Sequence, residues 1–257
     1  MAKLDALLMP SAVAPSPDTP FQALVDPKIR LRQTVSAINY WVRRANKFGF
    51  KIMVVDNTNF AEQIKAALPK RTLGSRLLQI HDVPQLTLKD IQRGKGAGET
   101  STLIQGLALL DLPGDAIVAK VNARYKTTNG LYLVDELESD FDFAAWPRPY
   151  LDSVDTTFFV GKVRYLTTAF EFVYTETDDL KEKFVENLYA DYSIRNPLCR
   201  FERFGYSPAI KGQSGTTGSK ASALNEFRIV SSIVRCRKQF RENLSFIKPG
   251  YQRGSKK

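Results

Sequence analysis

The sequence predicts an α/β fold in which a mostly parallel central sheet is flanked by helices. Short apolar segments typical of strands alternate with helical patterns through the first half of the chain, and this alternation indicates right-handed βαβ crossovers. Polar residues directly follow several of these strands, which is where α/β folds bind ligands. The length of 257 residues suits one large domain. We expect it to span residues 1–220, with residues 221–257 as an appendage.

The composition indicates a basic globular protein with an anionic partner. Hydrophobic residues make up 43% and charged residues 25% of the chain, which is typical of soluble proteins. No apolar run approaches the roughly 18 residues of a membrane span. The net charge of +10 favours nucleotide phosphates, nucleic acid or an anionic membrane surface. Cys199 and Cys236 have no metal-ligand spacing, so we interpret them as reduced thiols of a cytoplasmic protein.

Each element of the first half has its own pattern. Asp26-Pro27 opens a helix whose apolar residues recur at helical spacing, while its four arginines, Arg30 among them, are expected to face away. The N-terminal apolar run is a strand rather than a signal peptide because Asp5 interrupts it. The β-branched run KIMVV is typical of a strand buried on both faces. The predicted strands are Leu4–Val13, Lys51–Val55, Leu77–Ile80 and Ala116–Val121, and the predicted helices are Lys28–Phe48, Phe60–Leu68 and Glu99–Leu110.

The second half is expected to be mixed α+β, with a C-terminal helix. Phe204–Ser219 is a loop rich in Gly, Ser and Thr, and loops of this length are functional or mobile. Lys211 and Ser214 in this loop are candidates for closing over phosphates as a lid, and a plain mobile loop is the alternative. The predicted strands are Leu131–Val134, Phe141–Ala145 and Asp155–Val160, and the predicted helices are Leu166–Thr175, Asp178–Arg195 and Ala221–Leu244, before the basic tail Ile247–Lys257.

Polar residues at the end of the second strand form the first candidate site. Asp56-Asn57 follows KIMVV directly, and a carboxylate beside an amide can bind a nucleobase or a ribose hydroxyl. The alternative is a helix N-cap, for which both residue types are favoured.

The glycine-rich turn GKGAGE, Gly94–Glu99, is the second candidate. It matches neither a P-loop nor the dinucleotide fingerprint. Its glycines would let the backbone approach a ligand, Lys95 can meet a phosphate, and Glu99 can accept from sugar hydroxyls. A flexible surface turn, with Glu99 favoured by the helix dipole, is the alternative.

The strand end Asn122-Ala123-Arg124 is the third candidate, with Lys120 and Lys126 on either side. The planar guanidinium of Arg124 can neutralise a leaving diphosphate without a metal ion. A basic strand end facing solvent is the alternative.

Acidic residues supply further candidates. Asp140-Phe-Asp142 forms a D-x-D sequence that suits Mg or Mn, or else a solvated acidic edge. Glu186 lies in a helical pattern and is either a solvated residue or a general base, with Asp191 as its near alternative. His81 is the sole histidine, which disfavours triad-type hydrolysis.

Taken in order, these motifs resemble those of small bacterial glycosyltransferases from capsule and lipopolysaccharide gene clusters, which are GT-A-type enzymes. The shared features are Asp-Asn-Thr after the second strand, GKGxGE at a helix start, and a strand ending in Lys-x-Asn-x-Arg-Tyr. The last feature resembles a K-x-x-G-R-Y pattern, from which Asn122-Ala123 departs. The resemblance covers Leu4–Lys126, and Asp155–Gly215 more loosely.

This resemblance implies a GT-A-like, Rossmann-like domain that transfers a sugar from a nucleotide-sugar donor to a glycan or lipid-linked acceptor in surface polysaccharide synthesis. Asp56, with Asn57 beside it, would contact the nucleoside. Lys95 and Glu99 would line the donor pocket. Glu186 would be the base that activates the acceptor, with Asp155 second.

The resemblance also bears on metal dependence. Asn122-Ala123-Arg124 would stand where GT-A enzymes usually carry D-x-D, so no cofactor is expected to be required, and Mg or Mn is left open as the alternative. Arg124, Lys126 and Lys211 would neutralise the diphosphate charge instead.

Two other interpretations follow from the charge. A nucleic-acid-binding or nucleic-acid-modifying protein is the main alternative. The chain, however, has no RNP-like strand, helix-turn-helix or zinc-ligand set, so we expect no nucleic-acid partner. Between Arg235 and Lys257 there are eight basic residues and one acid, Glu242. This segment suits peripheral attachment to the anionic inner face of the plasma membrane.

Overall fold

A seven-stranded sheet forms the centre of the protein, whose computed structural model describes residues 2–213 and 220–221. The strand order is β3-β2-β1-β4-β7-β6-β8. The first four strands are mutually parallel, β7 is antiparallel to both β4 and β6, and β8 is parallel to β6. The α/β prediction with a mostly parallel sheet is therefore confirmed. The strands are β1 (Ala6–Ser11), β2 (Lys51–Asp56), β3 (Leu78–Asp82), β4 (Ile117–Val121), β6 (Phe143–Pro147), β7 (Val154–Lys162) and β8 (Phe201–Arg203).

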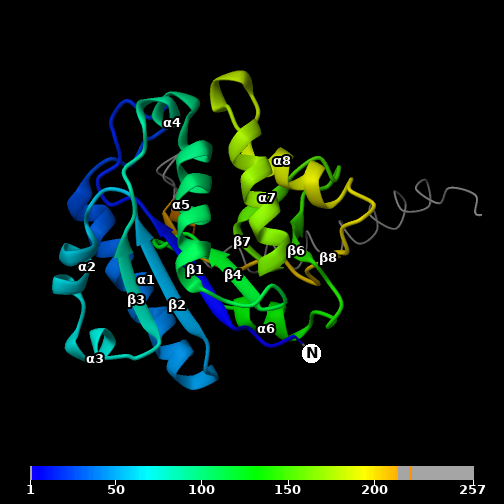
Figure 1. Ribbon diagram of the computed structural model, residues 1–257. Helices are drawn as coiled ribbons and strands as arrows, with labels where there is room; N and C mark the ends of the chain where they lie inside the picture. Colours follow the sequence, from blue (N-terminus) through cyan, green and yellow to red (C-terminus); the bar gives the residue numbers. More distant parts are fainter. Residues whose placement is uncertain (1, 214–219, 222–257) are drawn as a thin grey trace, which may run out of the picture. The chain divides into compact units, whose positions relative to one another are not determined.

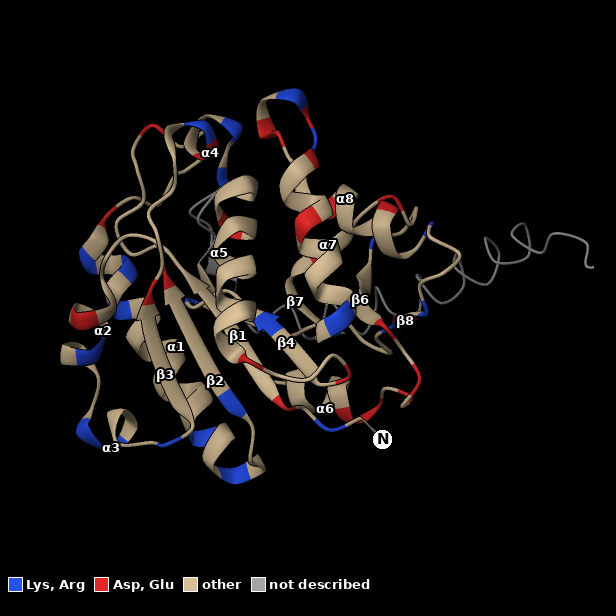
Figure 2. Cartoon of the chain, in the orientation of Figure 1, with Lys and Arg blue, Asp and Glu red and all other residues tan. Residues whose placement is uncertain are grey.

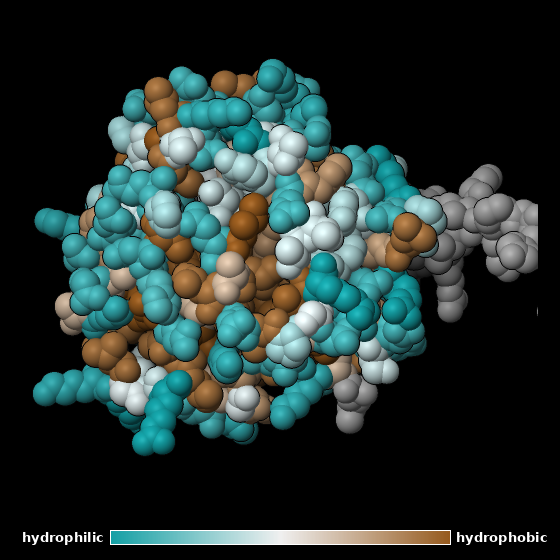
Figure 3. Space-filling view, in the orientation of Figure 1, coloured by the Kyte–Doolittle hydropathy of each residue, from teal (hydrophilic) through white to brown (hydrophobic). Residues whose placement is uncertain are grey.

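Helices cover both faces of this sheet because neighbouring residues of each strand point to opposite sides. Leu7 packs with the cluster that includes α1 (Pro27–Phe48), α2 (Ala61–Ala67) and α6 (Gly130–Asp135). Leu8 packs with α5 (Lys95–Leu110), α7 (Val163–Glu176) and α8 (Val185–Ser193). Figure 1 shows α5 and α7 side by side in front of the sheet, with α1 behind it. Hydrophobic residues gather between α5 and α7 on this front face (Figure 3).

Sequence-local signals set the ends of α1. The Asp26 carboxylate accepts from the backbone N–H groups of Lys28 (2.8 Å) and Ile29 (3.2 Å), and Pro27 occupies the first turn. Gly49 ends the helix at φ 80°, a left-handed conformation that favours glycine. The predicted helix over Lys28–Phe48 is therefore confirmed.

Short elements complete the described chain. A second sheet has the order β10-β9-β5, and its strand β9 lies inside the segment predicted as a loop over Phe204–Ser219. No described helix is both long and apolar enough to cross a membrane. Most of the predicted C-terminal helix, the basic tail and Ser214 lie outside the described residues. The remaining elements are α3 (Lys70–Leu73), α4 (Leu88–Arg93), the 3-10 helix η1 (Asp179–Lys181), β5 (Lys126–Thr127), β9 (Ile210–Gln213) and β10 (Lys220–Ala221).

Two predictions in the second half are wrong. Leu131–Val134 belongs to α6 rather than to a strand, because a run of four apolar residues fits a buried helix turn equally well. The helix predicted over Asp178–Arg195 is broken into η1 and α8. Glu182 takes a left-handed φ of 59° and Asp178 pairs with Lys183 across the break.

Gly106 marks the closest approach of α5 to the sheet, and we expect Gly106→Ala to destabilise the protein. A Cβ there would lie 2.6 Å from Leu8 Cδ1 and 2.8 Å from Val55 Cγ2, both in fully buried side chains. Overpacking typically costs about 1–3 kcal/mol, against roughly 1 kcal/mol gained in helix propensity. Chemical denaturation should show a net loss. Ala108→Gly on the exposed side of α5 gives the propensity effect alone, and a Gly106→Ala protein more stable than wild type would contradict tight packing.

Candidate functional site

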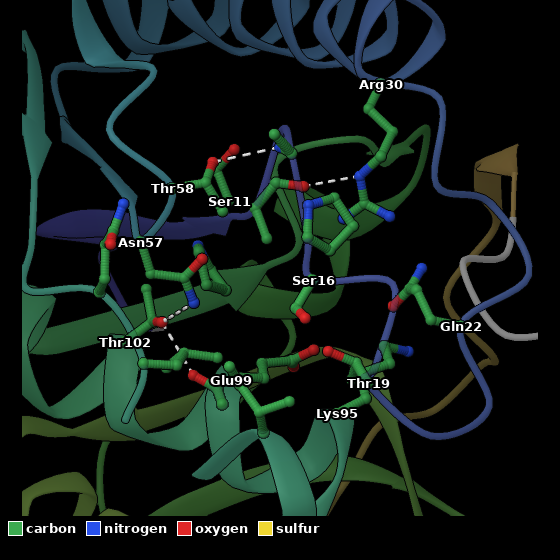
Figure 4. A pocket seen from close by; sticks show the side chains of 18 of the residues that line it. Ser11, Ser16, Thr19, Gln22, Arg30, Asn57, Thr58, Lys95, Glu99 and Thr102 are labelled. Atoms are coloured by element: carbon green, nitrogen blue, oxygen red, sulfur yellow. Dashed lines mark hydrogen bonds between the residues drawn. The ribbon is translucent and has the colours of Figure 1, made fainter. Parts of the chain in front are cut away.

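A cavity of about 250 Å³ opens at the carboxyl ends of β1, β2 and β4. One water needs only roughly 10–15 Å³ of such space, so the cavity has room for an organic ligand. Strand β1 lies between β2 and β4, and the order of the strands reverses there. The cavity therefore lies at the topological switch point, where α/β sheets bind ligands. Figure 4 shows the lining side chains, with Arg30 reaching in from α1. The polar and charged lining residues are Ser11, Ser16, Thr19, Gln22, Arg30, Asn57, Thr58, Gln85, Lys95, Glu99, Thr102, Asn122 and Arg124.

A buried ion pair with an amide forms one wall of this cavity. Lys120 Nζ donates to Glu99 Oε1 (2.5 Å), to Asn122 Oδ1 (2.6 Å) and to the carbonyl of Thr156 (2.6 Å). Asn122 Nδ2 donates to Glu99 Oε2 (2.7 Å), which closes the ring. Burial alone would raise the pKa of Glu99, but the charges of Lys120 and Lys95 and the hydrogen bonds from Lys120 and Asn122 hold it below its usual value. Glu99 is therefore an ionised carboxylate whose position is set by these hydrogen bonds.

Two polar atoms of the lining have no hydrogen-bond partner among the described residues. Asn57 Nδ2 donates to Thr102 Oγ1 (2.7 Å), and Thr102 uses its own proton on the carbonyl of Gly98 (2.8 Å). Asn57 must therefore present its amide nitrogen to Thr102 and its Oδ1 elsewhere. This Oδ1 and Ser11 Oγ are buried and unpartnered in the described chain, and both residues line the cavity. Such atoms are costly without a partner, so they indicate a polar ligand.

Two buried guanidinium groups lie at the same cavity. Arg124, 8% exposed, donates from Nη1 to the carbonyl of Gln213 (2.9 Å) and, more weakly, to Gln33 Oε1 (3.5 Å). Arg30, 4% exposed, donates from Nε to the carbonyl of Ala12 (2.6 Å) and from Nη1 to that of Leu24 (2.8 Å). Burial lowers the pKa of each, and the charge of Arg124 helps to lower that of Arg30 to about 9.

The glycine-rich segment does not form the open turn that the sequence predicts. Helix α5 begins at Lys95 instead of Glu99, so the segment is already helical. The carboxylate of Asp179 accepts from Gly96 N (3.1 Å) and occupies the helix N-terminus. A Cβ on Gly94 would lie 2.3 Å from that carboxylate, so glycine permits close packing there rather than approach to a ligand. Lys95 and Glu99 reach the cavity because they share a helix face with Gly98 and Thr102.

Asp56 lies beneath the cavity instead of in its lining. It is fully buried, and its Oδ1 accepts from Thr58 N (2.8 Å), Thr58 Oγ1 (2.5 Å) and Phe60 N (3.3 Å), while Oδ2 accepts from Val13 N (3.1 Å). These contacts hold the loop after β1 against the end of β2. Asp56 therefore shapes the wall to which Asn57 and Thr58 contribute.

Lys126 and Lys211 lie outside the cavity lining. They face each other in the β5–β9 ladder, and Lys126 Nζ donates to Ser36 Oγ (2.7 Å). Burial, Arg43 and Lys211 lower the pKa of Lys126. These lysines therefore belong to a basic patch between α1 and the small sheet.

Glu186 and Asp155 also lie outside the lining and flank Thr156, whose carbonyl accepts from Lys120. Glu186 Oε1 accepts from Thr156 Oγ1 (3.3 Å). Asp155 Oδ1 accepts from Thr157 N (2.9 Å) and Thr157 Oγ1 (2.5 Å). Both carboxylates are thus one residue away from the Glu99–Lys120–Asn122 ring.

The D-x-D sequence is engaged in ion pairs. Asp140 pairs with Arg200, and Asp142 lies 3.4 Å from Arg164 and 3.6 Å from Arg200. The described chain has no group of three or more His, Cys, Asp or Glu side chains suited to a metal ion.

Sequence reasoning missed several lining residues, above all Arg30, which was wrongly expected to face away from the core. The buried residues of α1 include Arg30, Thr34, Ala37, Ile38 and Trp41, so Arg30 continues the buried stripe by one turn. The spacing of Lys95, Gly98, Glu99 and Thr102 on one helix face could have indicated that α5 begins before Glu99.

Comparisons with known proteins give only distant similarity. No family model and no curated protein sequence matches the chain. Solved structures similar to it include the galactosyltransferase LgtC in complex with donor and acceptor sugar analogs (8% identity, 73% of this chain, 69% of that chain, TM-score 0.42). Others are an active-site mutant of LgtC (9%, 77%, 72%, 0.44) and a nucleotide-diphospho-sugar transferase from Desulfovibrio desulfuricans G20 (10%, 79%, 80%, 0.46). Identities and scores this low carry no argument about this chain.

Proposed function

We propose that the protein is a glycosyltransferase that binds a nucleotide-sugar donor in the switch-point cavity. The observation that supports this most strongly is the charge of the lining. It contains three cationic side chains, Arg30, Lys95 and Arg124, and one carboxylate, Glu99, which Lys120 already neutralises. Basic residues also surround α4 and the start of α5 at this end of the sheet (Figure 2). A ligand with a diphosphate matches this excess of positive charge.

The two ends of the donor have distinct partners in this proposal. The nucleoside lies against Asn57 Oδ1 and Ser11 Oγ, which offer an acceptor and a hydroxyl without partners in the described chain. The diphosphate lies toward Arg124 and Lys95. Between the nucleoside and the diphosphate, the cavity wall is formed by Glu99 and Asn122, which are fixed by their hydrogen bonds to each other and to Lys120.

The guanidinium of Arg124 would stabilise the leaving group. As the bond between the sugar and the diphosphate breaks, negative charge accumulates on the terminal phosphate. A buried, planar donor fixed by Gln213 meets this charge without reorganising. The polar lining is dominated by donors, and both oxygens of its one carboxylate already accept hydrogen bonds. Such a set does not match the oxygen ligands of Mg or Mn, so we assign no step to a cation.

The acceptor would be activated by Glu186, with Asp155 as the second candidate. Glu186 borders the Lys120 ring through Thr156, on the β7–α8 side of the sheet. An inverting transfer requires such a base to take the proton of the acceptor hydroxyl. The sequence resemblance supports a glycan or lipid-linked acceptor of surface polysaccharide synthesis. The basic composition of the sequence between Arg235 and Lys257 supports attachment to an anionic membrane surface.

Thermal unfolding with UDP-, GDP-, dTDP- and CMP-sugars, each with and without EDTA, tests the proposal. At least one donor should stabilise the protein, by about 2.7 kcal/mol at a concentration of 100 Kd, and EDTA should leave the effect unchanged. No stabilisation by any donor, together with tight salt-sensitive binding of DNA or RNA, would favour the nucleic-acid alternative. Loss of stabilisation on adding EDTA would show that a cation completes the site.

A further inference from the structure

Arg30 contributes a second guanidinium to the cavity from an element far from Arg124 in the sequence. It projects from the first turn of α1, and its side chain reaches the loop after β1 (Figure 4). Nε and Nη1 each donate to a backbone carbonyl, of Ala12 and of Leu24. A guanidinium has five N–H donors, and those of Nη2 have no partner among the described residues. Because Arg30 lines the cavity, these donors are available to a ligand.

Neither buried guanidinium has an ion-pair partner in the described chain. No carboxylate lies within 4 Å of Arg30 or Arg124, although Asp56 is among the charges that act on Arg30. The Asp56 oxygens instead accept from Val13, Thr58 and Phe60. An unpaired buried charge is costly, and a second one nearby adds repulsion, so the pair of arginines is suited to an anion of two or more charges.

Arg93, a half-buried arginine that stabilises the fold, has different surroundings in the same protein. Arg93 donates to the carbonyls of Tyr174, Thr175 and Thr177 at the end of α7. It also has a carboxylate, Asp90, at 3.9 Å. The charge of Arg93 is thus balanced by a nearby carboxylate, whereas Arg30 has no carboxylate within 4 Å among the described residues.

We propose that Arg30 and Arg124 together bind the diphosphate of the donor, with one guanidinium group for each phosphoryl group and Arg30 donating from Nη2. This inference rests on the proposed function and adds a residue to it. Two guanidinium groups match the charge of two phosphoryl groups better than one does. The site should therefore distinguish a diphosphate from a monophosphate, because the monophosphate can engage only one guanidinium fully.

Calorimetric titration of wild type, Arg30→Gln and Arg30→Lys with inorganic pyrophosphate and orthophosphate tests this, alongside the diphosphate and monophosphate of the preferred nucleoside. Hydrogen bonds to charged groups are worth about 1.5–3 kcal/mol, so Arg30→Gln should weaken binding of both diphosphates roughly 10- to 150-fold. The monophosphates should change far less. The affinity of Arg30→Lys, which keeps the charge but lacks the planar guanidinium, should fall between those of wild type and Arg30→Gln. Arg93→Gln is the matched control and should keep the wild-type preference for diphosphate even if it melts earlier.

The outcomes separate this inference from the proposed function. Unchanged diphosphate affinity in both Arg30 variants would overturn the role of Arg30 and leave the donor site standing. An equal loss for monophosphates and diphosphates would also overturn it, because that result fits a purely structural role. Wild-type binding of pyrophosphate but of no nucleotide would overturn the proposed function, while its loss in Arg30→Gln would support the two-arginine site. No binding of either by wild type would overturn both.

Discussion

Replacing Lys120 with methionine is expected to destabilise the protein by about 3–5 kcal/mol, the usual effect of removing one partner of a buried ion pair. Lys120 is 1% exposed, and its three donors are all used, on Glu99, Asn122 and the carbonyl of Thr156. Methionine fills similar space but leaves the carboxylate of Glu99 without its nearest cation. Urea denaturation at neutral pH measures the effect as a shift of the unfolding midpoint.

Two further variants test whether the destabilisation comes from the broken ion pair or from the loss of a buried lysine in general. Lys162→Met removes another lysine of low exposure (8%), for which the described chain shows no ion pair, and should be tolerated better. Adding Glu99→Gln to Lys120→Met should recover part of the loss, because the unpaired charge disappears. If the two substitutions are additive in a double-mutant cycle, the ion pair does not explain the effect.

The same pair predicts a pH dependence. Because the pKa of Glu99 is lowered in the folded protein, ionised Glu99 stabilises the fold above its unfolded pKa. That stability is lost as pH falls through the folded pKa. In Lys120→Met the carboxylate loses its nearest cation and the hydrogen bond from Lys120, so its folded pKa should rise. The difference in stability between the two proteins should therefore be largest at neutral pH and narrow as the pH falls toward 4.

Most of the first half of the fold was predictable because its signals are local. The cap of Asp26, the stop at Gly49 and the β-branched run of β2 each depend on a few adjacent residues. The second half depends on tertiary contacts. The predicted helix over Asp178–Arg195 is broken where Asp179 turns its side chain to the start of α5, and no local pattern encodes a partner 83 residues away.

The site was predictable only where polar residues end a strand or interrupt an apolar pattern. Asn57 and Arg124 follow β2 and β4, and both line the cavity. Arg30 could not be recognised in this way, because a lone arginine on an amphipathic helix is normally solvated. Its burial depends on Ala12 and Leu24, whose carbonyls the loop after β1 places against α1.

Arg124→Ala is expected to weaken donor binding roughly 30-fold to several thousand-fold, which corresponds to the 2–5 kcal/mol typical of truncating one partner of a buried charge pair. Arg124 is 8% exposed at the end of β4, and within the described residues its side chain donates hydrogen bonds to Gln213 and Gln33. A diphosphate would supply the counter-charge that the protein does not. Titration with the donor that most stabilises wild type measures the loss.

The stability of the Arg124→Ala protein is the decisive companion measurement. Removing this cation relieves its repulsion of Arg30, which lowers the pKa of Arg30 in wild type, while two hydrogen bonds to neutral groups are lost. These effects oppose each other, so unfolding free energy should change by no more than about 1 kcal/mol. Arg44→Ala removes a guanidinium that stacks on Tyr40 at 3.5 Å and lies outside the cavity, and it should bind donor normally. Wild-type donor affinity in Arg124→Ala would refute the role of this residue. Loss of binding together with unfolding would instead identify Arg124 as a structural residue.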